Sequence, residues 1–386
     1  MNKQITSISD KKIIILFLYW RLGLFLLDFL ANKLLAFKTS FPYSEILAKF
    51  ASPFFWQWAN FDGVHYIMIT QNGYKSIFSG ITQAFFPLYP LTIKFVNLFI
   101  HNFLFSGLLI ANMFFLASLL VFKRFLISLK INPLFPILLL LCFPTSYYFG
   151  AVYNESLFMF FSLGACLFIE KKKWLTTSLF ISLAAATRIT GLFLIIPLLG
   201  QYFSDVSLKN KKNIIKASVY VLIASLGFLA YSLYLYKNFH DFFYFATVQS
   251  KFGASRQTDK IILLYQVIWR YLKMFLTVNI NSLLFFTITQ EFMVSISVLG
   301  LIIIGFFKPI KSLNRFYLFY ALAAFILPTL TGNFSSMPRY VLVLFPIFII
   351  LDKLFKKGWQ KTIIIFIFMI LLIINTMLFL RGYWIA

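Results

Sequence analysis

The sequence is poor in charge, and acidic residues are especially few. Only 11 of its 386 residues are Asp or Glu and charged residues make up 12% of the chain, whereas 61% is hydrophobic. No stretch is both polar enough and long enough to form a soluble domain of any size. The 35 Lys and Arg give a net charge of +24, but they lie in short segments between apolar runs, as the basic loops of membrane proteins do. The composition therefore indicates a membrane protein and no nucleic-acid partner.

Cysteine is scarce as well, and the common signatures of cofactor chemistry are missing. Cys142 and Cys166 both lie in apolar runs, where a thiol is usually a small buried hydrophobe. No Cys/His cluster has the spacing of metal ligands, and no glycine-rich loop suited to a nucleotide occurs. The sequence thus predicts no certain cofactor and leaves only a divalent cation open. It also shows no internal repeat and no low-complexity linker.

Long apolar runs dominate what is present. Segments such as 103–122 and 363–380 are long enough to cross a hydrocarbon core of about 30 Å, and continuous apolar runs favour helices over a closed barrel. The first run is followed by Asn32 and Lys33 rather than by a small-residue cleavage pattern, so we expect a retained helix and not a signal peptide. The predicted class is an all-α polytopic protein of the cell membrane.

The basic residues predict an orientation. Lys3, Lys11 and Lys12 place the N-terminus in the cytoplasm. The segment 85–100 carries two prolines and a lysine, and 261–277 is amphipathic, so we interpret both as interfacial helices on the outer surface. With that choice more than half of the 35 Lys and Arg fall in cytoplasmic loops. About eleven transmembrane helices are then expected, at 13–31, 103–122, 134–152, 156–169, 174–187, 190–203, 214–236, 286–307, 316–330, 340–351 and 362–380.

We expect the chain to form a single integral-membrane domain, 1–386. Its expected parts are a catalytic module at 1–203, a first outer loop within that module at 37–102, and variable C-terminal helices at 204–386. Inside the first span, Arg21 and Asp28 are seven residues apart and share a helix face. Because ionisable groups at membrane depth usually pair, we expect a structural ion pair between them.

The first polar interval after the first span, residues 56–90, contains the pattern Asp62-Gly-Val-His65-Tyr66. If this stretch is helical, the three named side chains share one face, because residues three and four apart are neighbours. A carboxylate beside an imidazole and a phenol can take a proton from an acceptor and hold an anionic leaving group. The alternative is an interfacial loop with an aromatic belt.

Further polar residues are expected at the same membrane face. The predicted topology places Glu155, Arg188, Arg256 and Arg339 there with Asp62, although none of them sets the orientation. Two carboxylates and several arginines fit chemistry on an anionic, lipid-linked substrate, since the forked guanidinium group suits phosphate. The alternatives are arginines that only snorkel to the interface and a Glu155 that only caps a helix. We expect Glu155 within about 12 Å of Asp62, on one cavity.

Three blocks of the sequence resemble PIG-V-type mannosyltransferases. They are Phe61-Asp62-Gly-Val-His65-Tyr66 with Ala84-Phe-Phe-Pro87-Leu-Tyr-Pro90, then Phe143-Pro144 through Tyr153-Asn154-Glu155 to Phe158, and Arg188-Ile-Thr-Gly191. The likeness covers about residues 55–195, and beyond it only Gln249, Arg256 and 338–340 are similar to bacterial members. Phe61 departs from the Trp that the family often has before the Asp. The resemblance implies a GT-C fold with extracytoplasmic interfacial helices.

The resemblance also implies an inverting sugar transfer at the extracytoplasmic face. Mannose or another hexose would pass from a polyprenyl-phosphate sugar to a lipid-linked or cell-envelope glycan. Asp62 would act as the general base, and Glu155, the second catalytic carboxylate, would orient the acceptor or bind a cation. The implied residues for the donor phosphate are His65, Arg188, Arg256 and Arg339, and those for the substrate are Tyr66, Tyr153, Asn154 and Gln249.

Two other functions compete with this one. The first is a transporter or flippase for a lipid-linked glycan, and the second is a non-catalytic membrane subunit with the same fold. Transporters often contain inverted repeats and broken helices at the bilayer midplane. The lack of a repeat and the gathering of charge at one face favour the enzyme. The expected partners are the donor, the acceptor and membrane lipids, and the sequence identifies no partner subunit.

Overall fold

The computed structural model describes residues 8–38, 43–75, 80–253, 256–308, 310 and 312–385, and every regular element in these ranges is helical. Lys3, part of the expected cytoplasmic N-terminus, lies outside the described residues. Five described helices are long and apolar enough to cross a membrane: α1 (Asp10–Leu34), α6 (Phe103–Ser128), α11 (Lys211–Phe239), α14 (Leu283–Phe307) and α18 (Gly358–Leu380). The predicted all-helical class is confirmed, and these five helices fit a membrane protein.

Helix α1 shows why such elements suit lipid. Ser9 caps its first turn, because the hydroxyl accepts a hydrogen bond from the Lys12 amide (3.2 Å) and so satisfies a donor that the helix leaves unpaired. Further along, Leu18, Leu22 and Leu26 are 50%, 62% and 58% exposed. A continuous apolar surface of this kind is unfavourable in water and is covered in a bilayer.

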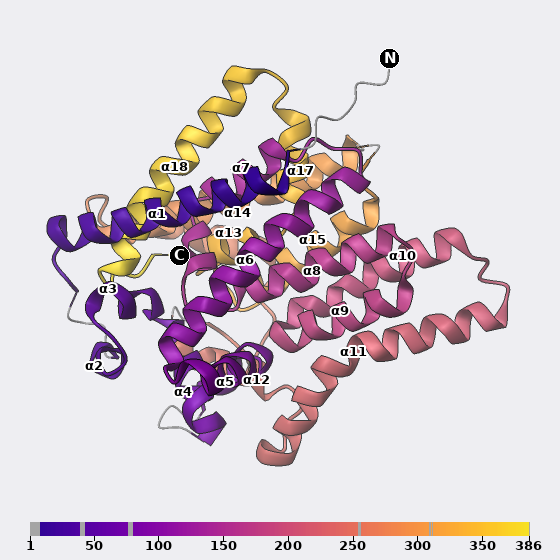
Figure 1. The fold of residues 1–386 in the computed structure, drawn as a ribbon, viewed down its shortest axis with the longest axis horizontal. Helices are drawn as coiled ribbons and strands as arrows, with labels where there is room; N and C mark the ends of the chain where they lie inside the picture. Colours follow the sequence, from indigo (N-terminus) through magenta and orange to yellow (C-terminus); the bar gives the residue numbers. More distant parts are fainter. Residues whose placement is uncertain are drawn as a thin grey trace.

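Shorter helices fill the space between the long ones. α6 packs against α8 (Glu155–Glu170), α8 packs against α9 (Trp174–Thr187), and α9 packs against α11 (Figure 1). Gly227 allows the last of these contacts, because a Cβ there would lie 2.0 Å from the Ser182 carbonyl oxygen. On the same bundle, α10 (Ile195–Asp205) packs against α15 (Arg315–Thr329).

The span expected at 134–152 is not one continuous helix. α7 (Leu134–Cys142) stops two residues before Pro144, and the short 3-10 helix η4 (Ser146–Gly150) follows. A proline disfavours helical geometry in the residue before it, and Phe143 accordingly has an extended ψ of 140°. Similarly, the span expected at 190–203 starts as the 3-10 helix η5 (Ile189–Leu194) before α10 begins.

The span expected at 340–351 is also broken. It consists of α16 (Met337–Leu342) and α17 (Pro346–Leu354). Pro346 has no amide hydrogen to continue the ladder of α16, but its ring suits the first position of a new helix. The expectation of uninterrupted helices at 134–152 and 340–351 is therefore wrong.

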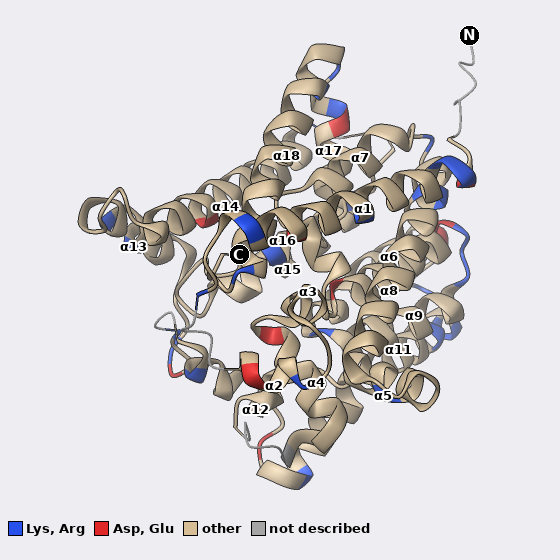
Figure 2. Ribbon diagram, turned by 60° about the vertical axis from the view of Figure 1, so that its left-hand side comes forward, with Lys and Arg blue, Asp and Glu red and all other residues tan. Residues whose placement is uncertain are grey.

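Polar and aromatic contacts join the helix ends that the expected topology places on one side. Lys123 Nζ, near the end of α6, lies 2.7 Å from Asp10 Oδ1 at the start of α1. The Tyr317 hydroxyl, at the start of α15, donates to Glu170 at the end of α8 (2.7 Å). The Tyr317 ring also lies 5.6 Å from the ring of Phe125 on α6. In Figure 2 basic residues gather at this end, near the start of α1 and beyond α8 and α9.

Short helices and two surface helices cover the other end of the bundle. α4 (Asp62–Asn72) is buried over most of its length, whereas α13 (Leu264–Thr277) buries only Val267 and Tyr271. The helices expected at 85–100 and 261–277 are present as α5 (Leu88–Ile100) and α13, and their interfacial position stays a prediction. The remaining elements are α2 (Ser44–Ala48), α3 (Pro53–Trp56), η1 (Gln57–Ala59), η2 (Gly73–Lys75), η3 (Thr82–Ala84), α12 (Tyr244–Thr247) and η6 (Val248–Phe252).

The structure corrects the ion pair predicted within α1. Asp28 accepts hydrogen bonds from the Trp58 indole N–H (2.8 Å) and from the Asn32 amide (2.8 Å). The Arg21 guanidinium instead lies 4.2 and 4.3 Å from the ring centres of Phe25 and Trp58, where the negative faces of the rings attract it. Both ionisable residues therefore hold Trp58, which fixes the segment before α4 against α1.

Candidate active site

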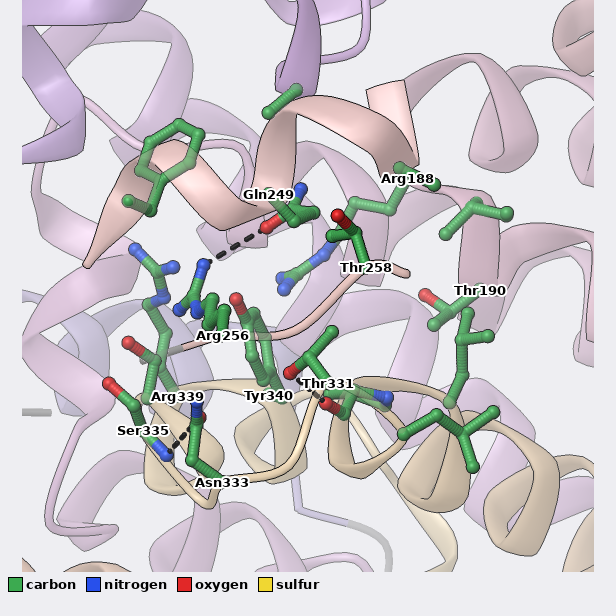
Figure 3. Close-up of a pocket in the computed structure, with 18 of the residues that line it drawn as sticks. Arg188, Thr190, Gln249, Arg256, Thr258, Thr331, Asn333, Ser335, Arg339 and Tyr340 are labelled. Carbon is green, nitrogen blue, oxygen red and sulfur yellow. Dashed lines mark hydrogen bonds between the residues drawn. The ribbon is translucent and has the colours of Figure 1, made fainter. Parts of the chain in front are cut away.

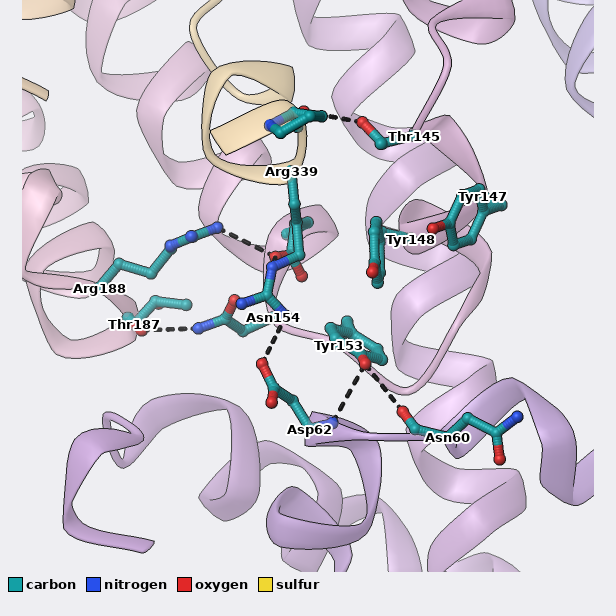
Figure 4. Close-up of polar contacts among 12 residues, drawn as sticks. Asn60, Asp62, Thr145, Tyr147, Tyr148, Tyr153, Asn154, Thr187, Arg188 and Arg339 are labelled. Atoms are coloured by element: carbon teal, nitrogen blue, oxygen red, sulfur yellow. Dashed lines mark hydrogen bonds and ion pairs between the residues drawn. The ribbon is translucent and has the colours of Figure 1, made fainter. Parts of the chain in front are cut away.

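Asp62 begins α4 at a turn that is held from several sides (Figure 4). The Tyr153 hydroxyl accepts from the Asp62 amide (3.1 Å) and donates to the Asn60 carbonyl (2.8 Å). The Asn60 side chain donates to two carbonyl oxygens at the end of α18 (2.9 and 3.0 Å). Phe61 between them has a φ of +58°, which is rare for a residue with a side chain and is typical of functional sites. These contacts fix the Asp62 backbone at a helix N-terminus, which favours a carboxylate.

Arg339 links the two predicted catalytic carboxylates. It extends from α16, its Nη1 donates to Asp62 Oδ2, and its Nε lies 3.6 Å from Glu155 Oε1 (Figure 4). Arg188, just after α9, donates to the same Glu155 oxygen (3.2 Å). Asp62, Arg339, Glu155 and Arg188 thus form a chain of alternating charge. Each carboxylate therefore has a cationic partner, which a charged group in a largely buried place requires.

The two carboxylates differ in how open they are to the cavity. The side chain of Asp62 is 15% exposed, whereas that of Glu155 is 2% exposed. Arg339 holds Oδ2 of Asp62, and Oδ1 makes no hydrogen bond to another described residue. Burial by itself would raise the pKa of Asp62, but the charge of Arg339 and its hydrogen bond outweigh burial and lower that pKa. Asp62 is therefore ionised at neutral pH with one oxygen open to a ligand.

Arg256 contributes a cation that no carboxylate engages. Its Nη1 donates to Gln249 Oε1 (3.0 Å), and its guanidinium lies 5.8 Å from the ring centre of Phe252. Among the described residues, no Asp or Glu oxygen lies within 4.0 Å of it. Figure 3 shows Arg256 beside Arg339 and Tyr340 in the cavity. Its charge is therefore available to an anionic ligand.

The two carboxylates and the three arginines described above all line one cavity of about 1130 Å³, a volume at the upper end of those found for ligand pockets. The prediction that Asp62 and Glu155 line one cavity is confirmed. One part of the lining, which we call the apolar wall, comes from the segment after η3, the start of α12, η5 and α15, and it includes Phe86, Phe243, Phe245, Ile189, Leu327 and Pro328. Another part, the mixed wall, comes from α13, α14 and the segment after α18 and includes Arg270, Tyr271, Thr287, Glu291 and Trp384.

Comparison with known proteins identifies the family. A family model described as mannosyltransferase (PIG-V) matches residues 8–243, which is more than half of the 386 residues. The chain belongs to this family. No match is found among curated proteins or among solved structures. The family confirms the predicted class, a membrane glycosyltransferase with mannosyltransferase activity.

Two predicted site residues of this mannosyltransferase do not line the cavity. His65 is 6% exposed, and its ring stacks on Phe85 with 5.1 Å between ring centres. Burial lowers the pKa of His65 although the charge of Asp62 opposes it, so the imidazole is neutral and offers no cation to a phosphate. Tyr153 is buried and its hydroxyl serves the backbone on both sides of Phe61. His65 therefore lies in an aromatic cluster, and the Tyr153 hydroxyl holds the backbone beside Asp62. The roles of both residues toward a substrate stay predictions.

The other predicted residues of the mannosyltransferase do line the cavity. They are Tyr66, Asn154, Arg188, Gln249, Arg256 and Arg339, together with the two carboxylates. The Asn154 side chain donates to the Thr187 carbonyl (2.9 Å) and so joins the start of α8 to the end of α9. Gln249 orients Arg256, as described above. The roles of these residues toward a substrate stay predictions.

Sequence reasoning missed Glu291 and Tyr271 of the mannosyltransferase. The Tyr271 hydroxyl donates to Glu291 Oε2 and accepts from the Phe334 amide (3.2 Å). Glu291 Oε1 accepts from the Ser336 amide (3.3 Å). The pair therefore holds the loop that leads into α16 and Arg339. A signal was present, because an acidic residue inside an apolar run is costly in lipid and usually marks a functional site.

Proposed function

We propose that the chain transfers mannose from a polyprenyl-phosphate mannose to a hydroxyl of a lipid-linked or cell-envelope glycan, with inversion, at the extracytoplasmic face of the membrane. One observation carries the proposal: the same cavity holds an ionised and open carboxylate, Asp62, and a cation, Arg256, that has no carboxylate within 4.0 Å in the described part of the chain. A base for the acceptor and a positive group for the leaving phosphate are the two parts that a single displacement at a sugar phosphate needs.

The walls of the cavity support a lipid-linked donor. The side chains of the apolar wall suit a polyprenyl chain, since burial of apolar surface favours such contacts. Arg188 and Arg256 line the same cavity, and a guanidinium binds phosphate oxygens through charge-assisted hydrogen bonds. We therefore assign the donor phosphate to these two arginines and the polyprenyl chain to the apolar wall.

The proposed reaction uses Asp62 once. The acceptor oxygen attacks the anomeric carbon, and its proton passes to Oδ1 of Asp62. The bond between the anomeric carbon and the phosphate oxygen breaks, and its electron pair stays on the phosphate, where Arg188 and Arg256 stabilise the charge. Arg339 keeps Asp62 ionised before the reaction. Because attack and departure occur on opposite faces of the ring, the anomeric centre inverts.

Glu155 has a supporting part in this scheme. Its Oε1 holds both Arg188 and Arg339, and it thereby positions one cation for the donor phosphate and the cation that pairs with Asp62, whereas its Oε2 is buried and has no hydrogen-bond partner among the described residues. A divalent cation does not fit here, because Arg339 lies between the two carboxylates that would bind it. The described residues also contain no group of three or more His, Cys, Asp or Glu that could hold a metal ion. We therefore assign no step to a cation.

Transfer by the purified protein tests the proposal. The protein in lipid nanodiscs is incubated with polyprenyl-phosphate mannose and a cell glycolipid extract, and mass spectrometry detects glycolipids that gain one hexose. NMR of the product then gives the anomeric configuration. We expect transfer with inversion from the lipid donor and none from GDP-mannose. Transfer from GDP-mannose alone, or no transfer by well-folded protein, would overturn the proposal.

The proposed membrane orientation has a separate test. We propose one integral-membrane unit, 1–386, with a cytoplasmic N-terminus, about eleven crossings and two broken ones at α7–η4 and α16–α17. The 29 residues of α11 span about 43 Å at 1.5 Å per residue, so its two ends face opposite sides. In a protein whose two native cysteines are replaced by serine, an impermeant thiol reagent should label Asn238→Cys in intact cells and Lys209→Cys only after permeabilisation. The reverse pattern would refute the orientation.

A further inference from the structure

We infer that Trp384 forms a subsite for a sugar ring of the acceptor, next to Asp62. The inference rests on the proposed function for the reaction and for the glycan acceptor, and it adds the place where a sugar ring of that acceptor binds. Trp384 lies in the segment after α18, lines the mixed wall of the cavity and is 39% exposed. An indole of this kind offers a large and rigid surface to a ligand at a low entropic cost.

The indole is held in place by contacts on both sides of it. Before Trp384, the Arg381 carbonyl accepts from the Lys38 amide (2.9 Å). After it, the hydroxyls of Tyr147 and Tyr148 both donate to the Ile385 carbonyl (3.3 Å each). The segment is thus fixed to the body of the protein. A fixed surface binds a ligand without first losing conformational freedom.

The indole is also placed relative to the proposed base. Its ring centre lies 5.1 Å from that of Phe61, with the two planes at 85°. Phe61 directly precedes Asp62, and the Tyr153 hydroxyl holds the backbone on both sides of it. Trp384 and the Asp62 carboxylate are therefore positioned by the same turn. A sugar that stacks on the indole lies beside the group that would take its proton.

The chemistry of the mixed wall fits a neutral sugar. A pyranose has one or two faces of polarised C–H groups, which the negative face of an indole attracts, and a rim of hydroxyl groups. Thr287 and Glu291 are four residues apart on α14, so they share a helix face, and both line the cavity. Their oxygens can accept hydrogen bonds from sugar hydroxyls. The Thr287 hydroxyl lies 3.5 Å from the Trp384 carbonyl, so this polar rim borders the indole.

The same wall is a poor place for the donor. Arg270 on this wall already donates to the Gly332 carbonyl (3.1 Å), so its guanidinium is directed at the backbone and is less available to a phosphate. The donor is thus expected on the apolar wall and the acceptor on the mixed wall, with Asp62 between them.

The test separates acceptor binding from donor binding. Transfer from polyprenyl-phosphate mannose is measured with two acceptor probes, n-octyl mannoside and n-octanol, the second of which has no sugar ring. The variants are Trp384→Ala and Trp384→Phe, and the matched control is Trp359→Ala, which removes an exposed Trp from the other end of α18. We expect Trp384→Ala to raise the KM for octyl mannoside about tenfold, which corresponds to about 1.4 kcal/mol. Trp384→Phe should have a smaller effect.

Donor KM and transfer to octanol should stay within twofold of the control in both variants. Equal changes for the two acceptors, or a change in the KM for octyl mannoside no larger than that of Trp359→Ala, would overturn the subsite. If Trp384→Ala does not fold, Trp384→Phe keeps the bulk of the ring and decides the question alone.

A binding measurement distinguishes failure of the subsite from failure of the proposed function. Saturation-transfer NMR with methyl mannobioside needs no donor and no turnover. We expect saturation of the mannobioside protons by the wild type and a clear loss with Trp384→Ala. If binding depends on Trp384 but no mannose is transferred, the proposed function fails and the subsite stands. If transfer occurs but neither binding nor acceptor KM depends on Trp384, only the subsite fails.

Discussion

Replacing Asp62 with Asn tests the central claim about the site. Asn has the same size, and its side-chain oxygen can still accept from Arg339, but it has no basic carboxylate. General-base catalysis contributes typically about 10²–10⁴-fold in rate. We therefore expect kcat to fall by about that factor. The donor KM should change little, because the donor phosphate is assigned to Arg188 and Arg256 and not to Asp62.

The same change should leave the protein folded. Asp62→Asn replaces a hydrogen bond between two charged groups by one with a single charge, and hydrogen bonds to charged groups contribute about 1.5–3 kcal/mol. Only part of that is lost, because the Asn oxygen still accepts from Arg339. Arg339 also keeps its contact with Glu155 (3.6 Å), so its charge is not left without a partner. Removal of all partners of a buried charge would be more harmful.

The assay compares Asp62→Asn with a matched control. Glu45→Gln makes the same kind of chemical change in the expected outer loop 37–102 that also contains Asp62, but Glu45 is exposed and does not line the cavity. Initial rates of transfer, donor binding and thermal unfolding are measured on the same preparations. If Asp62→Asn is well folded and its kcat lies within threefold of that of Glu45→Gln, Asp62 is not the base. Its contact with Arg339 would then be structural only.

Three further predictions follow from the site. Arg256→Gln should raise the donor KM at least tenfold, because a contact with the donor phosphate is lost. The control Lys251→Gln, on the neighbouring η6, should leave the donor KM unchanged. Equal donor KM values for the two variants would contradict the assignment of Arg256. Tyr153→Phe, which removes the hydroxyl that holds the Asp62 backbone, should lower kcat about tenfold with unchanged donor KM, and an unchanged kcat would count against its positioning role. The lowered pKa of Asp62 means that its contribution to stability and turnover is full above the unfolded pKa of about 3.9 and is lost as pH falls through the folded pKa. A plot of kcat against pH should therefore show no fall due to Asp62 between pH 8 and pH 5. If the wild type does show such a fall and Asp62→Asn does not, the pKa of Asp62 is not lowered.

The sequence was sufficient for most properties that depend on local pattern, although it did not predict the helix breaks at Pro144 and Pro346. Apolar runs predict helices wherever they occur, and the structure has them at both expected interfacial segments and at most expected spans. The Asp62-Gly-Val-His65-Tyr66 pattern was enough to find the turn that carries Asp62, and with the other two blocks it was enough to recognise the family. Such features need only neighbours in the chain, which a single sequence displays.

Contacts between distant segments could not be read from the sequence, and they decided the site. The sequence pairs Arg21 with Asp28 by helical spacing alone, and it assigns His65 to phosphate from its spacing to Asp62 and from the family resemblance. In the structure Trp58 contacts both Arg21 and Asp28, and the ring of His65 stacks on that of Phe85. The energy of a packed ring or a buried hydrogen bond depends on groups far away in the chain, which helical spacing does not include.

By itself, then, the sequence determined the membrane class, the family and the identity of the two carboxylates. Only the tertiary structure brought Arg339, 277 residues after Asp62 in the chain, between those carboxylates, and only it placed Glu291 and Trp384 on the cavity. The physical reason is that a buried charge must be paired wherever the fold provides a partner. That partner is set by where the tertiary structure places α16 relative to the starts of α4 and α8, and not by any pattern within a single helix.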